Sequence, residues 1–218
     1  MSGAPRGLLL DAMGTLLGLR HSVGHTYSRL AGDFGLRVDA ADLDRVFPTV
    51  YRQAPPLAFP GLRGAALLEA ERQWWQERIG EAFAASGHTE PLPTGLGPAL
   101  FERFASPELW RVYPDVPSQL QRWKTRGLKL AVVSNFDQRL LLLLEGLGLA
   151  EAMDCVVVSS TAGAAKPDPR PFQQALEALE LAPAEVWHVG DSPEDEAGAR
   201  AAGLRCVLIR RSQPGVEA

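Results

Sequence analysis

The amino-acid sequence predicts an α/β fold, in which helices cover both faces of a parallel sheet and a helical segment is inserted near the start of the chain. Apolar, strand-like runs occur at residues 7–11, 128–133, 155–159, 186–189 and 206–209. From residue 114 onward these runs alternate with helical patterns, and nearly continuous apolar strands are typical of a parallel sheet buried on both faces. The first two runs lie much further apart than the roughly 30 residues of a strand–helix–strand unit, which indicates the insertion.

The first strand ends at Asp11, and Gly14 then breaks the apolar run with a turn. Residues 17–111 have helical character. Ser22 is expected to cap the first helix, because apolar residues such as Tyr27 follow at helical spacing. Further helices of this segment are expected at residues 39–51, 65–84 and 99–104, with proline-rich loops between them.

The rest of the chain supplies the remaining strands and the helices between them. Those helices are expected at residues 116–126, 138–147, 170–181 and 195–202. The chain therefore divides into an α/β core domain, residues 1–17 and 112–218, and a helical cap domain, residues 18–111. A cap above the strand ends would shape a pocket and exclude water from it.

Composition narrows the function classes. The chain has 218 residues, 46% hydrophobic and 22% charged, which is ordinary for a soluble globular protein. A net charge of −4 argues against nucleic acid as the main partner. The longest leucine run, residues 140–144, is too short to span a membrane, and residues 1–7 lack the apolar stretch of a signal peptide. With only two cysteines, a disulfide framework is excluded, and we expect a cytoplasmic protein that is a monomer or a homodimer.

Polar side chains stand at the ends of three predicted strands. Asp11 ends the first, Ser134 and Asn135 follow the second, and Asp191 follows the fourth. Active groups of parallel sheets lie beyond the carboxyl ends of the strands. Each residue alone could simply cap the next helix. Together, the four predict one functional site.

Four segments resemble the sequence motifs of the haloacid dehalogenase superfamily. They occur in the family's order and span nearly the whole chain: residues 8–16 (LLLDAMGTL), 132–135 (VVSN), 166–169 (KPDP) and 189–195 (VGDSPED). Residues 19–21 and 71–75 also resemble the haloacid dehalogenase-like hydrolase domain-containing proteins of that superfamily. The resemblance implies a Rossmann-like core with an inserted helical cap.

The resemblance also implies a covalent mechanism on a small phosphate ester or another small anionic substrate. Asp11 would be the nucleophile that forms the covalent intermediate. Lys166 would keep Asp11 ionised and help to neutralise the anionic substrate. Ser134 and Asn135 would donate hydrogen bonds to it.

A magnesium site is implied at the same place. Two carboxylates as close as Asp11 and Asp191 repel each other unless a cation lies between them, and Mg²⁺ prefers oxygen ligands. The backbone carbonyl of Met13 would complete the ligands taken from the family pattern. Asp195 could act through water or orient another ligand, but it could equally be an acid that favours a helix N-terminus.

Met13 is the main departure from the family pattern. Phosphatases of the superfamily usually carry a second aspartate there, which protonates the leaving group and then activates water. A thioether does neither, and general acid–base catalysis is worth about 10²- to 10⁴-fold. Dehalogenases also lack this acid, since a halide leaves without a proton, but they need no metal. Three hypotheses stay open: a slow Mg²⁺-dependent phosphatase, a 2-haloacid dehalogenase, and a binding protein without catalysis.

Other residues give weaker signals. Gly14 and Thr15, beside the nucleophile, and Arg20 and His21, at the entrance to the cap, are candidate substrate-binding residues. Arg20 and His21 can also be read as solvated polar residues. The pair at positions 74 and 75, both tryptophan, is expected in the cap core or at an interface rather than as a stacking platform.

Overall fold

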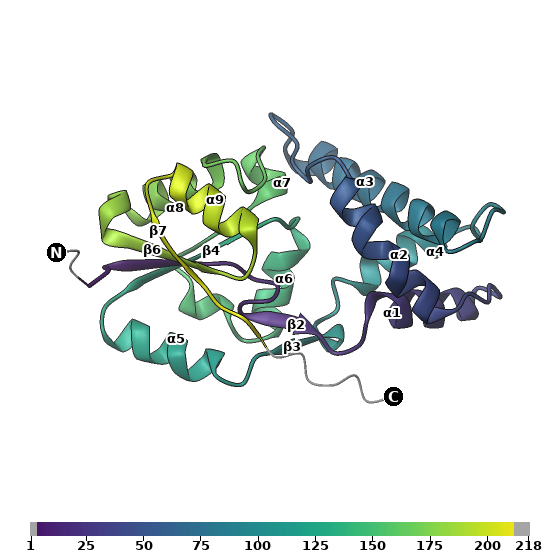
Figure 1. Ribbon diagram of the computed structural model, residues 1–218, viewed down its shortest axis with the longest axis horizontal. Helices are drawn as coiled ribbons and strands as arrows, with labels where there is room; N and C mark the ends of the chain where they lie inside the picture. The colour runs from purple at the N-terminus through teal and green to yellow at the C-terminus, as the bar shows by residue number, and fades with distance from the viewer. Residues whose placement is uncertain (1–3, 212–218) are drawn as a thin grey trace.

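A computed structural model describes residues 4–211 of the chain, and a five-stranded parallel sheet forms its centre (Figure 1). The strand order is β5-β4-β1-β6-β7. The strands are β1 (Gly7–Leu10), β4 (Lys129–Ser134), β5 (Cys155–Val158), β6 (Val186–Gly190) and β7 (Arg205–Leu208). The α/β class and the parallel sheet are therefore confirmed. Because β1 lies between β4 and β6, the carboxyl ends of these three strands are adjacent.

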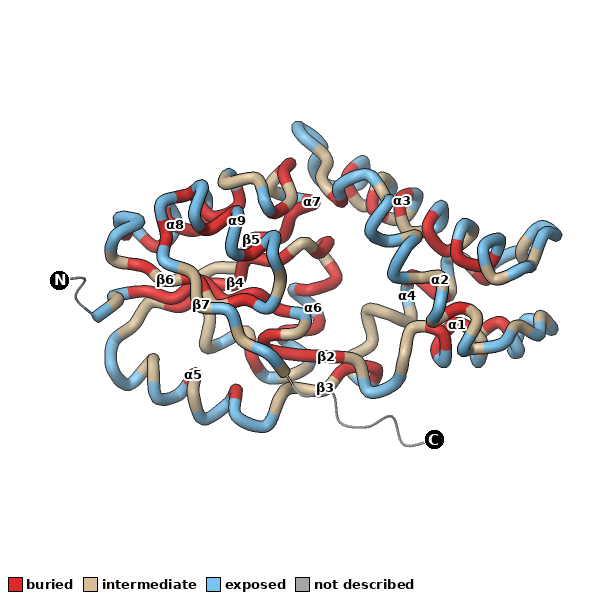
Figure 2. Tube along the Cα trace, viewed as in Figure 1, coloured by how far each residue is buried: buried red, intermediate tan, exposed pale blue. Residues whose placement is uncertain are grey.

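Helices cover both faces of the sheet. Successive side chains of a strand point to opposite faces, so an apolar strand needs packing partners on both sides. Leu8 and Leu10 of β1 belong to one hydrophobic cluster, with residues of α5 and α6, while Leu9 belongs to a second cluster, with residues of α8. Strands β1 and β4 are buried along most of their length, whereas the edge strand β7 has no buried residue (Figure 2). The helices around the sheet are α5 (Val116–Thr125), α6 (Arg139–Gly146), α7 (Ser159–Ala162), α8 (Arg170–Leu179) and α9 (Pro193–Ala201).

Four helices lie beside this unit and form a bundle with a hydrophobic cluster of its own (Figure 1). They are α1 (Val23–Asp33), α2 (Ala40–Gln53), α3 (Gly64–Ala85) and α4 (Leu96–Arg103). Ser22 caps α1 as predicted, since its side chain accepts a hydrogen bond from the backbone nitrogen of His25 at 3.1 Å. Tyr27, Leu43 and Phe83 are buried where the bundle helices meet.

The expectation of helices throughout residues 17–111 is wrong at both ends of that segment. Strands β2 (Leu17–Leu19) and β3 (Trp110–Val112) pair antiparallel as the chain enters and leaves the bundle. Leu17 lies opposite Val112, and Leu19 lies opposite Trp110. A run of three residues is too short for periodicity to separate strand from helix, so only the tertiary pairing identifies this ribbon.

Short elements and the cysteines complete the fold. Three 3₁₀ helices, η1 (Pro107–Leu109), η2 (Ala150–Ala152) and η3 (Pro183–Glu185), precede or follow strands. Within residues 4–211, no helix combines the length and the apolar character that crossing a membrane would require. Cys155 and Cys206 are free, and both are half-buried.

Candidate active site

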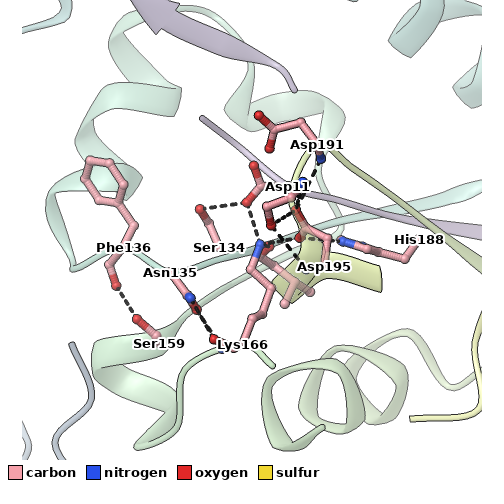
Figure 3. A network of polar contacts seen from close by, with 11 residues as sticks. Asp11, Ser134, Asn135, Phe136, Ser159, Lys166, His188, Asp191 and Asp195 are labelled. Carbon is pink, nitrogen blue, oxygen red and sulfur yellow. Dashed lines mark hydrogen bonds and ion pairs between the residues drawn. The ribbon is translucent and has the colours of Figure 1, made fainter. Parts of the chain in front are cut away.

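The polar residues predicted at the strand ends do lie together, at the carboxyl edge of the sheet (Figure 3). Asp11 directly follows β1, Ser134 ends β4, and Asp191 directly follows β6. Lys166 comes from the loop between α7 and α8, and Asp195 from the first turn of α9. The site therefore draws on five separate segments, which the parallel topology brings to one edge.

Lys166 is the centre of the hydrogen-bond network. Its Nζ donates to Oδ1 of Asp11 at 2.6 Å, to Oδ1 of Asp195 at 2.6 Å and to the carbonyl of Val133 at 3.1 Å (Figure 3). An ammonium has three hydrogens, so these bonds use all of them. Burial lowers the pKa of Lys166, but the charges of Asp11 and Asp195 outweigh burial and raise it. Lys166 is therefore a buried, permanent cation.

The two carboxylate oxygens of Asp11 differ in their hydrogen bonding. Oδ1 accepts hydrogen bonds from Lys166 and from Oγ of Ser134, the latter at 3.2 Å. Oδ2 has no hydrogen-bond partner in residues 4–211, and Asp11 lines the cavity described below. Burial raises the pKa of Asp11, although the charge of Lys166 opposes the rise. The arrangement presents one carboxylate oxygen to a bound substrate.

Asp195 is saturated with hydrogen bonds. Its Oδ1 accepts from Lys166 and from Nε2 of His188 at 2.8 Å. Its Oδ2 accepts from the backbone nitrogen and the hydroxyl of Ser192 at 3.1 and 2.7 Å, and from the backbone nitrogen of Asp191 at 3.2 Å. Burial opposes its ionisation, but the hydrogen bond from His188 and the charge of Lys166 lower the pKa of Asp195 overall.

These contacts give Asp195 two roles, as the acid at a helix N-terminus and as a residue that orients its neighbours in the site. With Ser192 it forms a capping box, so it is the acid at the N-terminus of α9. It also orients Lys166, and through it Asp11. Direct coordination of a metal by Asp195 would compete with five existing hydrogen bonds.

Within residues 4–211, Asp191 is the carboxylate of this site that has no cationic partner. Asp11, Asp191 and Asp195 offer oxygen atoms that all lie within 4.8 Å of one another. Burial and the charges of Asp11 and Asp195 raise the pKa of Asp191 to about 6. Three carboxylates share one lysine here, and oxygen-rich, negatively charged sites suit Mg²⁺. The residues present therefore fit a divalent cation.

Gly14 allows Asp191 to approach. Its φ of +81° is readily adopted only by glycine, and a Cβ at this position would overlap the Asp191 carboxylate. The turn after the nucleophile is thus packed directly against the second acid. This contact gives Gly14 a structural role beyond the turn and the substrate binding that the sequence suggested.

Asn135 contacts the main chain of Lys166. Its Nδ2 donates to the Lys166 carbonyl at 2.9 Å, and its Oδ1 accepts from the Lys166 nitrogen at 2.7 Å. This pair of bonds ties the lysine loop to the end of β4. Asn135 also lines the cavity, so it lies next to the substrate region while it positions Lys166.

The remaining candidates are spread out. Met13 lines the cavity and is 45% exposed. Arg20 and His21 are exposed and lie outside the cavity lining, and the His21 ring stacks on His25 at 4.6 Å. The hydroxyl of Thr15 is buried and has no partner in the described part of the chain. The structure does not bring Arg20, His21 or Thr15 to the carboxylates.

A cavity of about 670 Å³ lies between the sheet edge and the bundle. Asp11, Lys166 and Asp191 line its sheet side. The bundle supplies mostly apolar residues. Seven of them are aromatic and have no site role predicted from the sequence: Tyr27, Phe47, Tyr51, Trp74, Trp75, Phe101 and Phe104. The sequence offers only a weak signal for these cavity residues, because the core of a helical bundle also requires aromatic residues at helical spacing.

A polar junction fixes the bundle over this cavity. Trp75 of α3 donates from Nε1 to Oδ2 of Asp137 at 2.6 Å. Asp137 pairs with Arg139, also at 2.6 Å, and Arg139 donates to the carbonyl of Phe101 at 2.7 Å. Buried Glu71 of α3 accepts hydrogen bonds from the backbone and side chain of Gln138. Trp75 therefore lies at the interface between the bundle and the rest of the chain, which is one of the two places expected for the tryptophan pair.

Comparisons with known proteins agree with this geometry. A family model described as haloacid dehalogenase-like hydrolase matches residues 5–203. "Haloacid dehalogenase-like hydrolase domain-containing protein 3" of Bos taurus is 39% identical over 211 residues, covering 96% of this chain and 83% of that protein. A phosphoserine phosphatase of Thermus thermophilus is 38% identical over 151 residues, covering 66% and 59%. A crystal structure of a dehalogenase superposes with a TM-score of 0.70 at 25% identity, covering 100% and 91%.

Proposed function

This chain belongs to the haloacid dehalogenase-like hydrolase family, and from that membership we propose that it is a Mg²⁺-dependent, phosphatase-like hydrolase of small phosphate esters with an impaired acid–base step. The observation that carries the proposal is the asymmetry of Asp11. Lys166 and Ser134 hold one of its oxygens, and the other is without a partner among residues 4–211. A held carboxylate with one available oxygen at a cavity wall is the arrangement that nucleophilic attack requires.

The reaction divides into two displacements at phosphorus. Asp11 Oδ2 attacks the phosphorus, the bond to the leaving oxygen breaks, and an aspartyl phosphate forms. Water then attacks the phosphorus, and the bond to Asp11 breaks, which releases phosphate and restores the carboxylate. Lys166 and Ser134 keep the nucleophile oriented through both steps, and Asn135 holds the Lys166 main chain.

Asp11, Asp191 and the backbone carbonyl of Met13 would hold Mg²⁺, and Asp195 would orient Lys166 beside them. The support is the cluster of oxygen atoms from Asp11, Asp191 and Asp195, which all lie within 4.8 Å of one another. Burial and the charges of Asp11 and Asp195 raise the pKa of Asp191 to about 6, as expected where negative charge is crowded. When bound, Mg²⁺ supplies charge neutralisation for the anionic substrate.

Met13 limits this chemistry. It faces the cavity two residues after the nucleophile, where the family's phosphatases carry their proton donor. Its thioether cannot protonate a departing alkoxide or activate water. We therefore expect turnover to be about 10²- to 10⁴-fold below that of a site with a carboxylic acid there.

A 2-haloacid dehalogenase is the second candidate, because Met13 would not impair it. Asp11 would attack the carbon that carries the halogen, halide would leave without a proton, and water would hydrolyse the resulting ester. Superposition on a dehalogenase structure at 25% identity is compatible with this reaction. The cluster of Asp11, Asp191 and Asp195 oxygen atoms favours the phosphatase, because it fits a divalent cation that a dehalogenase does not need.

We further propose the domain roles. The bundle, within residues 18–111, acts as a cap over the core formed by residues 1–17 and 112–218. The cavity lined from both sides and the Trp75–Asp137 bond support this division. A reduced, cytoplasmic setting is proposed on the basis of the free thiols.

Phosphate release from p-nitrophenyl phosphate and from an alkyl phosphate, with Mg²⁺ or with EDTA, tests the proposal. We expect slow, Mg²⁺-stimulated release that Asp11→Asn abolishes. Met13→Asp should raise turnover by about 10- to 10³-fold, most for the alkyl ester, whose leaving group most needs a proton. The double variant with Asp11→Asn should be inactive.

Two results would overturn the proposal. Metal-independent halide release from 2-haloacids, without phosphate release, would make the dehalogenase the correct assignment. A folded Met13→Asp protein that binds Mg²⁺ and stays silent on all phosphate esters would leave a binding protein without catalysis.

A further inference from the structure

The cavity above Asp11 is much larger than a phosphate group requires. Its volume of about 670 Å³ lies within the roughly 300–1,000 Å³ range of sites that enclose whole organic ligands. The charged residues of the reaction occupy one side of it, and the bundle forms the other. The bundle side must therefore contact whatever group the phosphate is attached to.

That side offers very little hydrogen bonding. Of the lining residues between positions 19 and 104, all within the described part of the chain, only Arg52 is charged. Both indole nitrogens are already used, since Trp74 donates to the Pro55 carbonyl at 3.0 Å and Trp75 donates to Asp137 at 2.6 Å. The polar side chains left on this side are Arg52 and the hydroxyls of Tyr27 and Tyr51, so most hydroxyls of a sugar or polyol would lack a side-chain partner here, which costs free energy.

The bundle side instead offers stacked rings, the aromatic wall, which we define as Phe47, Tyr51, Trp74 and Trp75. Tyr51 stacks on Trp75 at a centroid distance of 6.1 Å and an interplanar angle of 27°, and on Phe47 at 6.1 Å and 23°. Trp74 meets Trp75 edge-on at 4.9 Å. Tyr51 is 38% exposed, so the wall presents an accessible ring to the cavity.

Arg139 does not change this character. It also lines the cavity, but its guanidinium pairs with buried Asp137 and lies 5.0 Å from the Trp75 ring centroid. The Tyr51 phenol is uncharged at neutral pH, because the ordinary pKa of tyrosine is about 10. The aromatic wall therefore carries no charge.

Met13 independently favours an aromatic leaving group. Without an acid at this position, a leaving oxygen must depart as an anion. A phenolic oxygen, with a pKa near 10 in tyrosine, departs far more readily than the alkoxide of a sugar or polyol. The missing proton donor and the aromatic wall thus select the same kind of ester.

We infer that the substrates are aryl phosphate esters, whose apolar ring lies against the aromatic wall while their phosphate lies at Asp11. This inference rests on the proposed function and specifies its leaving group. In the reaction, the bond from Asp11 to phosphorus forms, the bond from phosphorus to the phenolic oxygen breaks, and the phenolate takes its proton from water. Both the wall and Met13 disfavour sugar and polyol phosphates.

Binding of phosphonates, which are not hydrolysed, tests the inference separately from turnover. The probes are methylphosphonate and 1-naphthylphosphonate, titrated into the full-length protein with Mg²⁺. We expect the naphthyl compound to bind about 10- to 100-fold more tightly, from ring stacking and apolar burial. Tyr51→Ala should reduce this ratio by about 5- to 10-fold, whereas the matched control Tyr51→Phe, which keeps the ring, should preserve it.

Turnover provides the second measurement. The kcat/KM for 1-naphthyl phosphate should exceed that for glycerol 3-phosphate by at least about 100-fold, given the two independent penalties on the polyol ester. Equal phosphonate affinities, or a ratio unchanged by Tyr51→Ala, would overturn the inference while leaving phosphatase function intact. If neither phosphonate binds and no ester is hydrolysed, the proposed function fails together with the inference.

Discussion

Replacing Lys166 with methionine removes the lysine cation that is bound to both Asp11 and Asp195 while keeping a similar side-chain volume. In the native protein its Nζ lies 2.6 Å from an oxygen of each carboxylate. All three side chains are buried. The variant therefore leaves two negative charges in a site of low polarity, held close to each other by the surrounding strands and helix.

The cost follows from burial. Removing one member of a buried ion pair typically costs about 3–5 kcal/mol, because the remaining charge is unpaired. Domain stabilities are about 5–15 kcal/mol, so the loss is a large share of the total. Lys124 provides a matched control: its Nζ is 3.0 Å from Asp154, but both side chains are 36% exposed. Lys124→Met should cost less than about 1 kcal/mol.

The pH dependence of the loss has a defined sign. Without Lys166, burial should raise the pKa of folded Asp11 further above the unfolded value near 3.9, while the hydrogen bond from His188 still favours ionised Asp195. The folded variant then binds more protons than the unfolded chain between the unfolded value and the raised pKa of Asp11. Its stability must therefore fall as pH rises through this window. The loss relative to the native protein should be largest at pH 8 and smaller at pH 5.

Urea unfolding in EDTA at pH 5 and pH 8 measures these quantities for the native protein, Lys166→Met and Lys124→Met. Adding Asp195→Asn to Lys166→Met should recover part of the lost stability at pH 8, because one buried charge is removed. The electrostatic account is refuted if Lys166→Met costs no more than Lys124→Met at pH 8, or if its cost is independent of pH.

Three further substitutions test the acids and the glycines around them. In the folded protein the pKa of Asp191 is raised from 3.8 to about 6, so ionisation of Asp191 makes the metal-free protein less stable as pH rises from about 4 to 6. Asp191→Asn should therefore raise Tm in EDTA at pH 8. It should also abolish the increase in Tm that Mg²⁺ produces. An unchanged Mg²⁺ response would remove Asp191 from the metal site. Gly14→Ala, at a φ of +81° and against Asp191, should cost at least about 1 kcal/mol in urea unfolding and weaken Mg²⁺ binding in titrations. Gly198→Ala would place a Cβ 2.5 Å from the ring of buried Phe172, so it should cost about 1–3 kcal/mol in the same assay with Mg²⁺ affinity retained; a neutral result would contradict the packing of α9 on α8.

Local patterns determined much of the fold. The apolar runs predict the five strands of the sheet, because a strand buried on both faces must be apolar nearly throughout. The polar residues that end these runs predict where a site lies, since the carboxyl ends of parallel strands share one edge. Asp11, Ser134 and Asp191 could thus be placed together from the sequence alone. Lys166 could not, because it follows no strand, and only its resemblance to a family motif identified it.

Tertiary packing decided how these residues are used. Lys166 meets Asp11 across 155 positions of the chain, and no local pattern reports a hydrogen bond over such a separation. The same holds for Asp195, whose sequence position fits a helix cap and whose contacts also make it the partner of Lys166 and His188. Which acceptor a side chain finds depends on the elements that pack beside it.

The aromatic wall and the β2–β3 ribbon were also decided by tertiary structure. Phe47, Tyr51 and Trp75 have the spacing of core residues of a helical bundle, and the pattern is the same whether a ring faces another helix or a cavity. Only the placement of α2 and α3 over the sheet edge leaves the Tyr51 ring exposed to the cavity. The sequence therefore determined the chemistry at the strand ends, and packing between distant segments determined what that chemistry faces.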